Sequence, residues 1–121
     1  RSSYRLGIEV AMGCGASTAG RNATAHLLPR LRMDTACGII HLNLRHDAAP
    51  ITCDYITKAV KSRLYDGKVF YRSDFVIQCG LYGSGVEPPG NLTRNETRDG
   101  VFISNKRGTC AIAHFDVPDN G

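Results

Sequence analysis

Several features that mark other classes of protein are missing from this sequence of 121 residues. It has no tryptophan, and its five tyrosines and four phenylalanines leave few aromatic side chains for stacking against nucleic-acid bases. No apolar run approaches the ~20 residues that a helix needs to cross a bilayer, so we expect no transmembrane segment. The five cysteines include no CxxC pair, which argues against a disulfide framework or a structural zinc site and favours dispersed thiols in a reducing compartment.

Motifs for metal and nucleotide chemistry are also missing. The four histidines form neither an HxH nor an HxxxH pair, so we expect no metal site. Residues 15–20 have the spacing of a phosphate-binding loop, but Arg21 and Asn22 stand where such a loop needs lysine and then serine or threonine. We therefore expect no nucleotide and no other cofactor.

The net charge of +4 comes from the N-terminal part of the chain. Residues 1–33 carry five arginines and one acidic residue, whereas 34–121 carry equal numbers of basic and acidic residues. Because the larger part has no net charge, we expect no nucleic-acid partner. The composition predicts two segments: a basic extension at 1–33, disordered or involved in targeting, and a domain at 34–121.

The first translated residue and the compartment stay open at this point. Met12-Gly13-Cys14 begins a myristoylation-like pattern, which requires Met12 to start the chain, and Arg1 and Met33 are the alternatives. The neutral main part favours a cytoplasmic location, while the basic extension is compatible with a mitochondrial or membrane-associated one.

Hydrophobic periodicity predicts a mainly β domain with one clear helix. In the segment 38–46, Ile40, Leu42 and Leu44 alternate with polar residues, as in a half-buried strand. Pro50 is suited to the first position of a helix, and apolar residues then recur at helical spacing to about Leu64. Short strands are expected at 6–12, 69–72, 75–79, 101–103 and 109–115, with a turn at 65–68 and a long loop at 81–100. Short strands with one helix suggest a closed antiparallel sheet with helical cover.

Three segments between Gly38 and Gly121 resemble the cyclophilins, the family of peptidyl-prolyl cis-trans isomerases. They read GIIHLNLRHDAAPIT, YDGKVFYRSDFVIQCG and RGTCAIAHFDVPDNG, and the second is similar to the family's YDGxxFHR and FxIQGG motifs. The resemblance implies an antiparallel β-barrel with one to two helices. The family's sequence continues beyond the position matched by Gly121, so we expect an incomplete barrel that belongs to a longer gene product.

The resemblance also implies roles for matching residues. Arg72 is similar to the catalytic arginine, with Gln78 beside it. Phe75 and Val76 match the apolar floor that holds the proline ring. The peptide-binding stretch is matched by Ala113, His114 and Phe115.

The link between the arginine and the floor departs from the family pattern. Only Ser73 and Asp74 separate Arg72 from Phe75, where the family has a longer Val-Ile-Pro-Gly-like link. Taken alone, Arg72 could equally be a surface arginine paired with Asp74 or Asp66.

Two functions are compatible with these residues. The first is a peptidyl-prolyl cis-trans isomerase that acts on proline-containing protein segments, and the resemblance then also implies binding of the macrocycle cyclosporin. The second is a non-catalytic cyclophilin-like subunit of a larger assembly, which the shortened link and the incomplete barrel favour.

Overall fold

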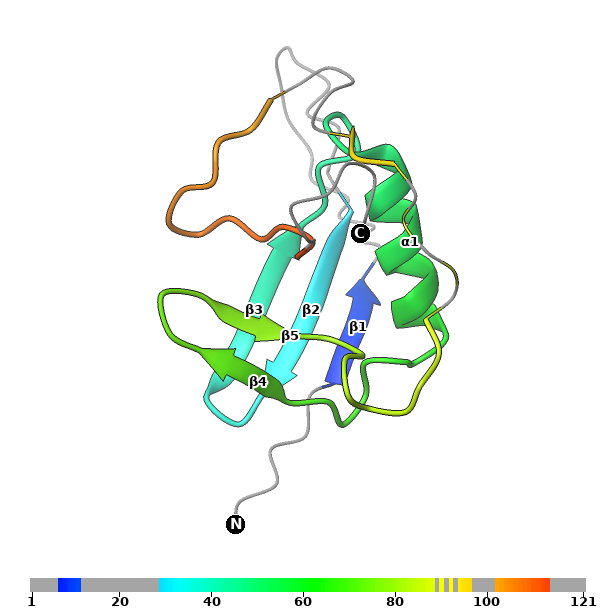
Figure 1. Ribbon diagram of the computed structural model, residues 1–121, viewed down its shortest axis with the longest axis vertical. Coiled ribbons are helices and arrows are strands. Elements are labelled where there is room, and N and C mark those ends of the chain that lie inside the picture. Colours follow the sequence, from blue (N-terminus) through cyan, green and yellow to red (C-terminus); the bar gives the residue numbers. More distant parts are fainter. Residues whose placement is uncertain are drawn as a thin grey trace, which may run out of the picture.

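The structure is a computed structural model, which describes residues 7–11 (backbone alone), 29–88, 90, 92, 94–96 and 102–113. Its elements are two antiparallel sheets and one helix (Figure 1). In chain order they are β1 (Gly7–Ala11), β2 (Arg30–Thr35), β3 (Gly38–Asn43), α1 (Pro50–Lys61), β4 (Phe70–Ser73) and β5 (Ile77–Cys79).

The larger sheet has the order β1-β2-β3, with β2 in the centre. Strands β2 and β3 form a tight hairpin in which Thr35 and Gly38 are partners and the Thr35 hydroxyl donates to the Gly38 carbonyl at 2.7 Å. Leu31 and Met33 are buried, and Arg32 between them is not, as the two-residue period of a strand requires. Among the described side chains of this sheet, the buried ones therefore belong to the central strand.

Helix α1 packs against the same sheet and contacts β1 (Figure 1). Its buried residues are Cys53, Ala59 and Val60, which recur at helical spacing and form one face. Burial raises the pKa of the Cys53 thiol to about 11, so this cysteine is a neutral, apolar part of the core near pH 7. These side chains form the core of the described residues together with Leu31 and Met33 of β2 and with Leu92, which lies in the segment after β5.

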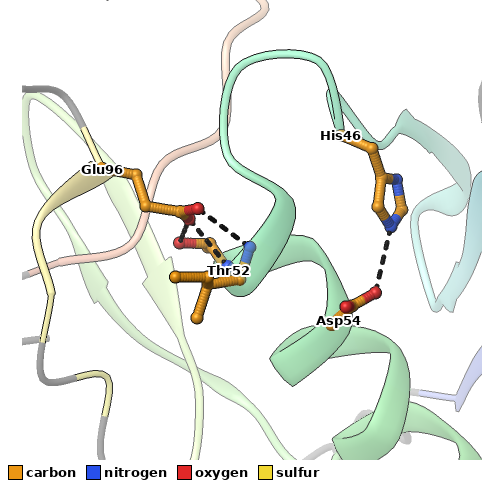
Figure 2. Close-up of polar contacts among 5 residues, drawn as sticks. His46, Thr52, Asp54 and Glu96 are labelled. Carbon is orange, nitrogen blue, oxygen red and sulfur yellow. Dashed lines mark hydrogen bonds and ion pairs between the residues drawn. The ribbon is translucent and has the colours of Figure 1, made fainter. Parts of the chain in front are cut away.

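The first turn of α1 is capped from a distant part of the chain. Ala49 precedes the helix and has no side chain that can accept a hydrogen bond. Instead the carboxylate of Glu96, which is only 7% exposed, accepts the backbone N–H groups of Ile51 at 2.9 Å and Thr52 at 2.8 Å. It also accepts the Thr52 hydroxyl at 2.7 Å (Figure 2). A buried carboxylate thereby satisfies N–H groups that lack partners within the helix and complements the positive end of its dipole.

The C-terminal end of α1 is closed by a Schellman-type turn. The N–H of Leu64 donates to the carbonyl of Ala59 at 3.1 Å, and that of Arg63 donates to Val60 at 2.9 Å. Arg63 has φ of 58°, in the left-handed region that glycine adopts most readily. Its guanidinium lies 2.6 Å from Asp66. The helix thus ends before Leu64, and Arg63 lies outside it.

The burial of residues 40–44, on and just after β3, confirms the predicted alternation. Ile40, Leu42 and Leu44 are half-buried, whereas the residues between them are exposed. Strand β1 lies within the predicted strand 6–12, while β2 was not predicted. Because β2 begins at Arg30, the predicted boundary after residue 33 falls inside a strand. The division into two segments stays a prediction.

Two predicted strands are wrong where the structure describes them. Residues 102–103 and 109–113 have no regular secondary structure, because no neighbouring strand pairs with them among the described residues. The predicted strand 75–79 is shorter than expected: β5 begins at Ile77, and Phe75 belongs to the preceding turn.

The predicted fold class is confirmed as mainly β with antiparallel pairing and one helix. In the described part of the chain the two sheets do not close into a barrel, which agrees with a partial fold. No described helix is long and apolar enough to cross a membrane.

We predict that Glu96→Ala lowers the free energy of unfolding by about 3 kcal/mol, since two backbone N–H groups lose a charged acceptor. Glu96→Gln, which keeps one acceptor oxygen, should lose about half of that. Urea unfolding followed by circular dichroism measures both. Glu87→Ala, at an exposed position of the same loop, is the matched control. Equal stability of Glu96→Ala and the control would contradict the capping role.

We also predict that Arg63→Gly raises the free energy of unfolding relative to Arg63→Ala by about 1 kcal/mol. Both variants lose the exposed ion pair with Asp66, but only glycine relieves the left-handed backbone. Thermal unfolding of the two variants provides the comparison. If alanine is tolerated as well as glycine, the strain assigned to residue 63 is absent.

Candidate active site

The candidate site lies on the hairpin formed by β4 and β5. The partners across it are Phe70 with Cys79, Arg72 with Gln78 and Ser73 with Ile77, so the register shifts between Phe70 and Arg72. Tyr71 is the additional residue on β4, as in a β-bulge. Without this shift Arg72 would oppose Ile77. The bulge instead places the arginine opposite Gln78, and directly opposite residues share a face of the hairpin.

The Arg72 guanidinium makes two contacts at the tip of this hairpin. Its Nε donates to Oδ2 of Asp74 at 2.9 Å. Its Cζ lies 5.0 Å from the centroid of the Phe75 ring, within the range of a cation–π interaction. The sequence left open whether Asp74 or Asp66 would pair with this arginine. Asp74 is its partner, and Asp66 pairs with Arg63 instead.

Asp74 joins the arginine to the turn. Its Oδ1 accepts the backbone N–H of Val76 at 3.1 Å, and its own N–H donates to the Val76 carbonyl at 3.0 Å. The hydrogen bond from Val76 and then that from Arg72 hold the pKa of the Asp74 carboxyl below its ordinary value of 3.8. Asp74 is therefore ionised throughout the neutral and mildly acidic range, and the ion pair is in place there.

The two residues expected to form the apolar floor lie in the turn between the strands. Phe75 is 85% exposed and Val76 is about half as exposed. The only ring face contact that Phe75 shows among the described residues is the Arg72 guanidinium. The phenylalanine is thus adjacent to the arginine, and it lies exposed at the surface.

Gln78 is half-buried on β5, and aromatic and thiol side chains contact or influence one another on and near this hairpin. The rings of Tyr71 and Tyr82 pack at 5.7 Å between centroids. Burial and the neighbouring Cys110 raise the pKa of the Cys79 thiol, and burial raises that of the Tyr65 phenol to about 12. These groups are neutral near pH 7, so they support the hairpin without adding charge to it.

The third predicted part of the site is only partly described. Ala113 is exposed at the end of the segment 102–113. His114 and Phe115 lie outside the described residues. The structure therefore brings together Arg72, Phe75, Val76 and Gln78 on one hairpin.

Sequence reasoning missed two features of this site. The bulge at Tyr71 follows no local signal, because glycine is absent from β4 and the register is set by pairing. The second carboxylate contact, from Asp74 to the turn, could have been found: aspartate commonly accepts the N–H of the residue two positions later. Among the described residues no three metal-ligating side chains gather. The site offers a cation and an aromatic face, those of Arg72 and Phe75.

Comparisons with known proteins agree on one family. The family described as cyclophilin type peptidyl-prolyl cis-trans isomerase/CLD matches residues 30–121. The chain is 31% identical over 103 residues to a peptidyl-prolyl cis-trans isomerase of Acinetobacter baylyi, covering 80% of this chain and 54% of that protein. It is 33% identical over 92 residues to the isomerase cyp18 of Streptomyces antibioticus, covering 73% of this chain and 54% of that protein.

The chain spans about half the length of these curated relatives. No solved structure matches it at a comparable level. The family match covers most of the chain, and it includes the hairpin that carries Arg72, Phe75 and Gln78. The chain therefore belongs to the cyclophilin family.

Proposed function

We propose that this protein is a peptidyl-prolyl cis-trans isomerase that acts on X–Pro bonds in protein segments. The observation that carries the proposal is the Arg72 guanidinium, held 5.0 Å from the centroid of the Phe75 ring. Membership of the cyclophilin family and the names of two relatives support the same activity.

The reaction requires a site that favours a twisted amide. An X–Pro bond rotates against a barrier of ~20 kcal/mol, because its amide is conjugated. Rotation breaks the conjugation and leaves a lone pair on the prolyl nitrogen. A cation beside that nitrogen stabilises the twisted form more than either planar form, which lowers the barrier. An acceleration of about 10⁵-fold requires about 7 kcal/mol.

The residues of the hairpin fit these requirements in different ways. Arg72 supplies a permanent positive charge with several N–H donors in one plane. Phe75 supplies an exposed apolar face on which a proline ring can pack. Gln78 lies opposite Arg72 on β5, and its side-chain amide can donate a hydrogen bond to the peptide backbone or accept one from it. The mechanism uses no nucleophile, because no bond is broken.

The same surface would contact cyclosporin through the Phe75 face if the protein binds this macrocycle. The alternative function, a non-catalytic subunit of a larger assembly, is not favoured, since both bacterial relatives are named as isomerases.

We predict that Arg72→Ala lowers kcat/KM for a proline-containing peptide by about 100-fold, because one electrostatic donor in the transition state is lost. Arg72→Lys keeps the charge without the planar fork and should recover part of the rate. A protease-coupled or NMR exchange assay measures the isomerisation rate.

Arg45→Ala is the matched control, because Arg45 also pairs with an aspartate two residues later and is similarly exposed. It should leave the rate unchanged. A rate that is above the uncatalysed background and equal in wild type and Arg72→Ala would contradict the assignment of Arg72, and no rate above background in wild type would contradict the enzyme.

A second prediction concerns the aromatic face. Phe75→Ala should raise KM by roughly 10-fold or more, since the proline ring loses apolar contact area, while Phe75→Tyr should change KM little. Phe102→Ala removes an exposed phenylalanine elsewhere and serves as control. Equal KM values for Phe75→Ala and Phe102→Ala would show that the Phe75 face does not bind proline.

A further inference from the structure

Three segments of the chain place an aspartate two residues after an arginine and pair the two side chains. They are Arg32 with Asp34, Arg45 with Asp47 and Arg72 with Asp74. The side chains of the last two pairs are almost equally exposed, at 46% and 48% for Arg45 and Asp47 and at 44% and 48% for Arg72 and Asp74. Exposure therefore does not distinguish the pair in the candidate site from a surface ion pair.

The neighbours of the Arg72 pair do distinguish it. The Arg72 guanidinium lies over the ring of Phe75, the same ring on which a proline would pack. Asp74 holds the guanidinium there through Nε and is itself fixed by the Val76 N–H. In the free protein the arginine thus lies over one face of a ring that is otherwise exposed, and the aspartate compensates the arginine's charge.

A peptide that enters this site has to rearrange both contacts. A proline ring that packs on the face occupied by Arg72 displaces the guanidinium from it. When the guanidinium leaves this ring face and turns to the prolyl nitrogen, Nε moves away from Asp74, and their hydrogen bond lengthens or breaks. The carboxylate therefore stabilises the free protein relative to the complex, and the difference appears as weaker peptide binding.

We propose that Asp74 is a residue that restrains Arg72 over Phe75 and competes with the X–Pro segment for the arginine. This inference rests on the proposed function, because it assigns Asp74 an effect on the peptide site of Arg72. Asp74 acts through Arg72, so it is a positioning residue and contacts no reacting atom. The carboxylate belongs to the two-residue link between Arg72 and Phe75.

The test is Asp74→Asn, which keeps an oxygen that can accept the Val76 N–H and removes the charge that holds Arg72. Since the contact belongs to the free protein, we expect KM to fall about two- to fivefold, in the range of one exposed ion pair, with kcat changed less than about twofold. Asp74→Ser, whose hydroxyl can also accept the turn hydrogen bond, should give the same split.

Ionic strength provides an independent readout. With an uncharged proline peptide, raising NaCl from 10 to 500 mM should screen the exposed ion pair and lower the wild-type KM toward that of Asp74→Asn. The KM of Asp74→Asn should change much less with salt. Asp47→Asn, which removes the carboxylate of the matched pair, should behave as wild type in both KM and salt dependence.

Spectroscopy tests the contact without relying on activity. The Arg72 Nε–H resonance, identified by its loss in Arg72→Lys, should shift in Asp74→Asn and in wild type saturated with the peptide. It should not shift in Asp47→Asn. A resonance that is unchanged on adding peptide would show that binding leaves the Asp74 contact intact, which contradicts the inference.

The possible failures are distinguishable. Loss of kcat or a higher KM in both Asp74 variants would show that the carboxylate holds Arg72 in its active position. A KM and a kcat equal to those of Asp47→Asn would show that the Asp74 carboxylate has no effect. Either outcome overturns the inference. In those cases a large loss in Arg72→Ala would still support the isomerase. Wild-type protein with no rate above background would overturn the proposed function itself.

Discussion

The short turn between β4 and β5 is the constraint on which the candidate site depends. Ser73 and Ile77 are partners at the ends of the strands, so only the residues 74–76 connect them. Such a turn has to satisfy its own backbone groups, and Asp74 does this by accepting the Val76 N–H. The same carboxylate then binds Arg72, and the guanidinium contacts Phe75. Turn formation, charge pairing and the aromatic contact are therefore one connected arrangement.

Carboxylates organise both the first turn of α1 and the turn between β4 and β5, but they do so in different dielectric surroundings. Glu96 is buried and accepts helix N–H groups, where few water molecules compete for the hydrogen bonds. Asp74 is half-exposed, where water and salt compete with its contact to Arg72. The buried contact of Glu96 with the helix stabilises the fold, whereas the weaker contact of Asp74 with Arg72 can be exchanged for a contact with a ligand. This difference is why the two acidic residues are assigned different roles.

Local sequence signals predicted most of the regular structure correctly where neighbouring residues decide it. The alternation in β3 and the proline at the start of α1 both carry their own physical cause, namely the strand period and the fixed φ of proline. The prediction failed for residues 102–103 and 109–113, because a short apolar run becomes a strand only if another strand pairs with it. It also missed β2, whose alternating Leu31 and Met33 lie among arginines that were assigned to a basic extension.

The sequence by itself determined the family, the helix that begins at Pro50, two short strands around residues 69–79 and the presence of an arginine, a phenylalanine and a glutamine at fixed spacing, because each depends on residues close together in the chain. The tertiary structure decided what those residues contact. The register shift at Tyr71 set Arg72 opposite Gln78, and Glu96 reached the start of α1 from 45 residues away. Both depend on pairing between segments, and the free energy of such pairing comes from burial and hydrogen bonds that no local window contains.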